Sequence, residues 1–186
     1  MPKIAEIENT PNPNAMKFIL KEPLTWGVSR SYENAEQAKD DPLAAALFAI
    51  DHVSNVFYVE HWITVTQDGG ADWQELKRQL AEPIRAAPAA DAESAAMAEA
   101  ATEALSRLTP EERQRLDRIN ALLDEEIRPY LQSDGGDLYV LGIDGNTLNV
   151  HYQGACGSCP SSLSGTLAGI QSLVRSIEPD LEVVAV

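Results

Sequence analysis

An alanine-rich segment near the middle of the chain limits what this chain can fold into. Residues 88–108 read PAADAESAAMAEAATEALSRL, in which nine of 21 residues are alanine, four are acidic and one is basic. Alanine favours helix, but large apolar residues are nearly absent, so this segment has no face to bury in a core. We therefore predict a solvated linker over 86–108 that joins two separately folding pieces, 1–85 and 109–186.

The charge and the cysteine content narrow the function classes. The chain has 186 residues, with 14 Lys and Arg against 29 Asp and Glu, a net charge of −15. Such a chain is repelled by phosphate backbones, so we expect no nucleic-acid partner. No apolar run approaches the roughly 18 residues of a transmembrane helix, and the first residues show no targeting pattern. We expect a cytoplasmic protein without a membrane partner. Two cysteines three residues apart cannot form a disulfide framework.

The N-terminal piece is predicted to be a mixed layer of helices and strands. Asp41 can cap a helix that Pro42 begins, because proline suits the first helical position. Apolar, alternating or β-branched runs predict strands over 17–20, 53–59 and 62–66. Large apolar residues four positions apart predict a second helix over 73–84. His52 and His61 lack companion ligands at a metal-binding spacing, so we expect surface or structural roles for both.

The C-terminal piece predicts the order helix, hairpin, helix, strand. Thr109 to Glu112 forms a capping box that starts the first helix. Asp144-Gly145-Asn146 is a hairpin signal, because glycine and asparagine tolerate positive φ. The remaining elements are predicted as strands over 138–143, 147–152 and 181–186 and a helix over 163–177. The fold class expected for the whole chain is α+β, in two small layered domains.

The chemistry is concentrated in one loop of the C-terminal piece. Residues 154–162 read GACGSCPSS and join a predicted strand to a predicted helix that Pro160 begins. Cys156 and Cys159 then lie at a helix N-terminus, where the helix dipole favours the thiolate form that binds metal. We expect both thiols to be ligands and, because neither is taken to be part of the core, we expect the apoprotein to fold without them.

Four interpretations of this C-x-x-C loop remain open. A thioredoxin-like dithiol needs a βαβ unit with a parallel strand ahead of the motif, whereas an antiparallel hairpin is predicted here. A structural zinc ion needs four ligands in one site, and one chain offers two cysteines and His151, so a zinc ion bridged between two chains of a dimer, with half a site from each, is the form this alternative takes. The cysteines can also be an inert pair. Finally, an iron–sulfur cluster is normally held by four thiolates, which two chains would supply together. A cluster shared in this way is labile, which suits a carrier better than an enzyme.

Two separated motifs of the C-terminal piece resemble the NifU-like C-terminal domain of Nfu-type proteins. They are IRPYLQSDGGD at 127–137 and GACGSCPSS at 154–162. This resemblance implies a [4Fe-4S] cluster bound by Cys156 and Cys159 and bridged between two subunits of a homodimer. It implies no enzymatic activity, but scaffolding or delivery of the cluster, received from an upstream donor, to client apoproteins.

The N-terminal piece is similar to the N-terminal domain of the same family. The similarity lies in TPNPNAMKF at 10–18, in Pro42-Leu43-Ala44 and in the strand region 53–66. The resemblance implies that residues 1–85 carry no cluster and help to dock client proteins, while residues 109–186 bind the cluster.

Overall fold

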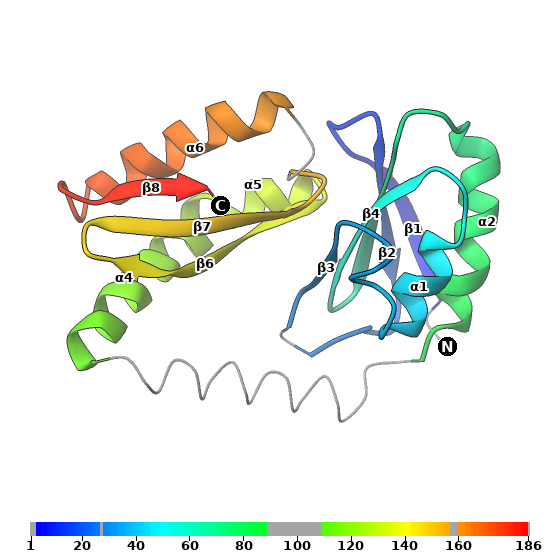
Figure 1. Ribbon diagram of the computed structural model, residues 1–186, viewed down its shortest axis with the longest axis horizontal. Helices are drawn as coiled ribbons and strands as arrows, with labels where there is room; N and C mark the ends of the chain where they lie inside the picture. The colour runs from blue at the N-terminus through cyan, green and yellow to red at the C-terminus, as the bar shows by residue number, and fades with distance from the viewer. Residues whose placement is uncertain (1–2, 27, 89–108, 157–159, 186) are drawn as a thin grey trace. The chain divides into compact units, whose positions relative to one another are not determined.

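The computed structural model describes residues 3–26, 28–88, 109–156 and 160–185. By its internal contacts the chain divides into two compact units, Met1–Ala101 and Thr102–Val186. Both units combine helices with a sheet, which confirms the α+β class (Figure 1). Most of the predicted linker, residues 89–108, lies outside the described residues. Its first residue, Ala86, is the last residue of a helix.

The N-terminal unit is an antiparallel five-stranded sheet with two helices on one face (Figure 1). The strand order is β1-β2-β5-β4-β3. The elements are β1 (Ile4–Asn9), β2 (Ala15–Leu20), β3 (Arg30–Tyr32), α1 (Pro42–Phe48), β4 (Val53–Val59), β5 (Trp62–Gln67) and α2 (Trp73–Ala86). Alternate residues of the inner strands, such as Phe18, Val56 and Ile63, are buried against the helices. The sequence did not predict β1 or β3, the two edge strands.

A buried carboxylate ties α1 to the sheet. Asp41 caps α1 by accepting a hydrogen bond from the Ala44 backbone N–H at 2.9 Å, as its position before Pro42 predicts. Its other oxygen accepts hydrogen bonds from Arg30 and from the hydroxyl of Tyr32, both at 2.8 Å, and from the hydroxyl of Tyr58. We call Arg30, Tyr32, Asp41 and Tyr58 the Asp41 cluster.

The C-terminal unit is a three-stranded sheet whose helices share one core with it. Its elements are α4 (Pro110–Glu126), α5 (Arg128–Ser133), β6 (Gly136–Asp144), β7 (Thr147–Gly154), α6 (Pro160–Arg175) and β8 (Glu182–Ala185). The capping box forms at Thr109, and Gly145 makes the hairpin turn with φ +60°. Ile119, Leu123, Ile170 and Val174 pack with strand residues in one buried cluster, which places α4 and α6 on the same face.

The pairing of β8 alters one argument made from the sequence. β6 and β7 form the expected antiparallel hairpin, but β8 pairs with β7 in parallel. A parallel pair needs a crossover, and α6 supplies it, so β7, α6 and β8 make a βαβ unit (Figure 1). The predicted hairpin does not exclude a βαβ unit, because β7 takes part in both. The topological objection to a thioredoxin-like dithiol was therefore wrong.

Candidate functional site

The two motifs of the C-terminal unit come together in space. Gly136 at the start of β6 pairs with Gly154 at the end of β7, and the Ala155 N–H donates to the Gly135 carbonyl at 3.2 Å. A Cβ atom placed on Gly136 would lie 2.6 Å from Sγ of Cys156. Residues twenty positions apart in sequence therefore build one wall of one site, with the cysteine side chain packed directly on the glycine backbone.

Glycine is required at this meeting point for two different reasons. Gly135 and Gly154 have φ values of +81° and +69°, in the left-handed region that favours glycine. Gly136 has no such φ, but the space of a side chain is already filled by Cys156 and by the Gln153 carbonyl, also 2.6 Å away. The Asp-Gly-Gly-Asp motif thus turns the chain and clears room for the cysteine.

Cys156 is a core residue in this structure. Its side chain is only 1% exposed and belongs to the buried cluster of the C-terminal unit. Sγ lies 4.0 Å from the Leu131 carbonyl at the end of α5, as a weak thiol hydrogen bond. The expectation that the thiols lie outside the core was wrong for Cys156, because α5 and the Gly136 backbone close over it. Cys159 lies outside the described residues.

Tyr152 is the polar neighbour of Cys156 that sequence reasoning missed. Its side chain is 6% exposed, and its hydroxyl is buried with no hydrogen-bond partner among the described residues. Burial, followed by the nearby charge of Cys156, raises the pKa of Tyr152 to about 12. The sequence predicted a strand that includes Tyr152, but not that its hydroxyl would be buried without a partner among the described residues.

His151 lies on the other face of β7. Val150 and Tyr152 are buried in the core, so by strand alternation His151 points away from that core, and it pairs across the hairpin with Tyr139. The structure does not bring His151 to Cys156, which removes the third ligand that the zinc interpretation used.

A polar network holds the Asp-Gly-Gly-Asp segment to α5. Asp137 accepts a hydrogen bond from Gln132 at 3.3 Å, and Arg128 Nε lies 3.7 Å from the Asp137 carboxylate. Burial raises the pKa of Asp137 above its usual value, against the opposing effects of the Leu138 N–H and the Arg128 charge. Arg128 also contacts Asp124 and Asn120 of α4. Contacts with α4 and α5 thereby fix the Asp-Gly-Gly-Asp segment that packs against Cys156.

The described residues include one thiol that could bind a metal, Cys156, but no complete metal site. Among them no three side chains of His, Cys, Asp or Glu come together as a potential metal-binding group. A thiolate suits iron and other soft metals. For such a metal, further ligands would have to come from Cys159 or from another molecule.

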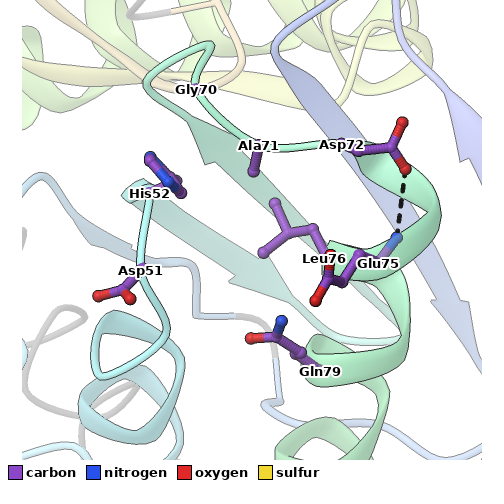
Figure 2. A pocket seen from close by; sticks show the side chains of 8 residues that line it. All are labelled: Asp51, His52, Gly70, Ala71, Asp72, Glu75, Leu76 and Gln79. Carbon is purple, nitrogen blue, oxygen red and sulfur yellow. Dashed lines mark hydrogen bonds between the residues drawn. The ribbon is translucent and has the colours of Figure 1, made fainter.

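The N-terminal unit contains a hollow of about 270 Å³ with an acidic lining (Figure 2). Asp51 and His52 face Asp72, Glu75 and Gln79 of the first turns of α2 across it. His52, with φ +74°, pairs with Asp68 at 3.1 Å, in agreement with a structural role, and Asp72 caps α2. His52 and Asp72 thus already serve the turn and the helix cap, so we do not assign a ligand to the hollow.

Among the described residues no helix is both long enough and apolar enough to cross a bilayer.

Comparisons with known proteins match both units. Residues 4–90 match the family model described as scaffold protein Nfu/NifU N terminal, and residues 119–185 match the NifU-like domain. The human protein named NFU1 iron-sulfur cluster scaffold homolog, mitochondrial, is 33% identical over 95% of this chain and 69% of its own length. Its counterpart of the same name in Drosophila sechellia is 30% identical over 95% of this chain and 62% of its own length.

Among solved structures, the NifU-like protein from Saccharomyces cerevisiae is 24% identical, covering 42% of this chain and 72% of that chain. Its TM-score is 0.39, at which the likeness supports no conclusion about this chain.

The expectation of a cytoplasmic protein was wrong. The relatives from fly and human are named as mitochondrial proteins. The expectation rested on the first residues of the chain, yet the chain spans only 62% of the length of the Drosophila relatives that it matches. The charge and composition of the folded domains do not encode a compartment, so they gave no independent support.

Proposed function

The chain belongs to the Nfu family of scaffold proteins, and from this premise we propose that it carries an iron–sulfur cluster and delivers it to apoproteins. The cluster is a cargo, received from an upstream donor and passed on, and the role is not enzymatic. The observation that carries the proposal is the packing of the Asp-Gly-Gly-Asp motif against Cys156, with Gly136 in direct contact with the sulfur atom.

The proposed ligands are Cys156 and Cys159, and the proposed cargo is a [4Fe-4S] cluster. Four thiolates normally hold such a cluster, and a chain with two cysteines supplies half of them. We therefore propose that the loaded form is a homodimer with the cluster between its subunits. A client that offers its own thiolates can replace one pair at a time, which is a route to transfer by ligand exchange.

The proposed division of labour follows the two family matches. Residues 109–186 form the cluster-binding domain, residues 1–85 form the domain that docks client proteins, and residues 86–108 link them. Because Cys156 is buried, its sulfur has to leave the contact with Leu131 before it reaches iron. Loading is therefore proposed to require a local rearrangement around Cys156.

Anaerobic reconstitution with iron and sulfide tests the proposal. We expect a brown protein with about two iron and about two sulfide per chain, and a shift from monomer to dimer on a sizing column. Cys156→Ser and Cys159→Ser should each abolish stable loading and the size shift. A Cys156→Ser protein that binds a full complement of iron would contradict the proposed ligand set.

The same experiment separates the dithiol alternative, which the βαβ unit around α6 favours on topology. A dithiol oxidoreductase should stay colourless after reconstitution and reduce disulfides. A protein that takes up zinc in place of iron and sulfide would point to the bridged zinc site instead.

A further inference from the structure

The hydroxyl of Tyr152 is buried without a partner beside the proposed ligand Cys156. The side chain is 6% exposed, and the oxygen atom makes no hydrogen bond within the described part of the chain. A buried hydroxyl that donates to nothing has a free-energy cost, so such groups are uncommon in native cores. Within the described part of the chain, no acceptor offsets that cost for the Tyr152 hydroxyl.

The position of Tyr152 on β7 points the hydroxyl into the interior that holds Cys156. Tyr152 and Gly154 share the core face of β7, and Cys156 follows two residues after Gly154. Tyr152 and Cys156 belong to one buried cluster, and the charge of Cys156 acts on the tyrosine. The two side chains therefore lie in the same buried core, in a region where water is excluded.

Loading a cluster changes what Cys156 can do with its neighbours. In the structure the thiol is placed to donate to the Leu131 carbonyl. Iron binds the thiolate, which has no proton, so that contact becomes one between two acceptors and is unfavourable. The thiolate sulfur can then accept a hydrogen bond, and the Tyr152 hydroxyl has a proton to donate and no acceptor within the described part of the chain.

We propose that Tyr152 donates a hydrogen bond to the Cys156 sulfur in the cluster-loaded protein and so positions that ligand. The inference rests on the proposed function and deepens it. Hydrogen bonds to the sulfur atoms help to set the reduction potential of an iron–sulfur cluster and how tightly the protein binds it. Tyr152 would therefore slow the release of the cluster and raise its reduction potential.

Tyr152→Phe tests this, with Tyr139→Phe as the matched control. Tyr139 lies on the neighbouring strand, but it is 49% exposed and faces away from the core. In the apoprotein, Tyr152→Phe should leave the thermal midpoint unchanged or higher, because it removes only an unpaired hydroxyl. In the loaded protein, the same change should speed cluster release to a chelator about tenfold, since a bond to a charged acceptor is lost. The control should change neither measurement.

A second measurement detects the hydrogen bond directly. The loaded protein in D₂O should show an exchangeable deuteron coupled to the cluster and shifted iron–thiolate vibrations, and both signals should weaken in Tyr152→Phe. A lower thermal midpoint of the apo variant would overturn the inference, because the hydroxyl would then have a structural partner. Unchanged release with unchanged spectra would also overturn it.

Failure of the inference and failure of the proposed function give different results. If wild-type protein loads a cluster and Tyr152→Phe matches it in every measurement, only the inference falls. If wild-type protein takes up no iron and sulfide, the proposed function falls and takes the inference with it.

Discussion

The two compact units each bury a tyrosine on a core strand, and the two hydroxyl groups differ in what they contact. In the N-terminal unit, Tyr58 donates to Asp41, which also accepts from Arg30, Tyr32 and the Ala44 backbone. In the C-terminal unit, Tyr152 reaches no acceptor among the described residues. A carboxylate of the same unit accepts from the Tyr58 hydroxyl, whereas no described residue accepts from the Tyr152 hydroxyl.

We interpret this difference as a contrast between a buried polar group that serves stability and one that serves the proposed cargo. A satisfied buried network rigidifies a fold, whereas a partly satisfied one costs stability unless something else binds to it. The Asp41 cluster joins β3, β4 and the start of α1. We call Leu131, Gly136, Tyr152 and Cys156 the Cys156 site. Its first three residues belong to the surroundings of the proposed ligand, Cys156.

Gly136→Ala should have the largest effect, because it disrupts the packing of Gly136 against Cys156. The added methyl group would lie 2.6 Å from both the Cys156 sulfur and the Gln153 carbonyl, and the carbonyl is backbone that cannot turn aside. We expect the C-terminal unit to lose about 3 kcal/mol of unfolding free energy and the protein to lose cluster loading. Urea unfolding and iron counts measure the two losses.

Gly169→Ala is the control for this substitution. Gly169 lies in α6, where nothing stands within 4 Å of the methyl group that alanine would add. Alanine in a helix interior should stabilise the same unit by about 0.5–1 kcal/mol. If Gly136→Ala behaves like Gly169→Ala, the close packing of Gly136 on Cys156 does not determine the site.

Asp41→Asn should have the next largest effect, confined to the N-terminal unit. It leaves the Arg30 charge and two tyrosine hydroxyls without their carboxylate, and removal of one partner of a buried ion pair costs about 3 kcal/mol. The absorbance of the iron–sulfur cluster should not change. Asp40→Asn, at an exposed position next in sequence, should change unfolding by less than about 0.5 kcal/mol. Loss of iron–sulfur cluster binding in Asp41→Asn would mean that the two units are coupled.

The contributions of Asp41 and Asp137 to stability should depend on pH with opposite signs. Burial acts to raise the pKa of Asp41, but hydrogen bonds from Ala44, Tyr58, Tyr32 and Arg30 outweigh it and hold the pKa below its usual value. The stability that ionised Asp41 contributes is therefore present above the unfolded pKa of about 3.9 and is lost as pH falls through the lower folded value. The difference between wild type and Asp41→Asn in urea unfolding should shrink as the solution is acidified.

Asp137, beside the Cys156 site, should show the reverse dependence. Its pKa is raised by burial, so the folded state holds the proton more tightly than the unfolded state. The contribution of Asp137 to stability should fall as pH rises from about 3.9 through the folded pKa, so Asp137→Asn should gain on wild type over that window. Parallel slopes for the two variants would contradict the assigned environments.

Local chemistry explains what the sequence predicted correctly. The caps at Asp41 and Thr109 and the turn at Gly145 depend on residues within four positions of each other, and all three form. Both hairpin strands and α2 also follow the predicted pattern, with ends that differ by no more than two residues. Within the C-x-x-C loop, the position of Cys156 after a strand and of Pro160 at a helix start was predictable for the same reason.

The features that were missed depend on residues far apart in the chain. β1 and β3 are edge strands with few buried residues, so their patterns are weak. The parallel pairing of β8 with β7 requires the whole of α6 to lie between them. The burial of Cys156 results from Leu131 and Gly136, 25 and 20 residues earlier, and no spacing rule contains that contact.

Thr109→Ala should cause the smallest loss of unfolding free energy, with which the effects of the other substitutions can be compared. Thr109 lies before α4 in the same unit as the Cys156 site, but its hydroxyl serves only the capping box with Glu112. The substitution leaves the first turn of α4 short of one acceptor and should cost about 1 kcal/mol, measured by urea unfolding of the apoprotein. Loading and release of the cluster should be unchanged, because the box is exposed and contacts none of the site residues. An ordinary local contact would then lower stability alone, whereas Tyr152→Phe should alter release without lowering stability. If Thr109→Ala also speeds release of the cluster, then a loss of stability anywhere in this unit is enough to speed release. The Cys156 site would then have no distinct role.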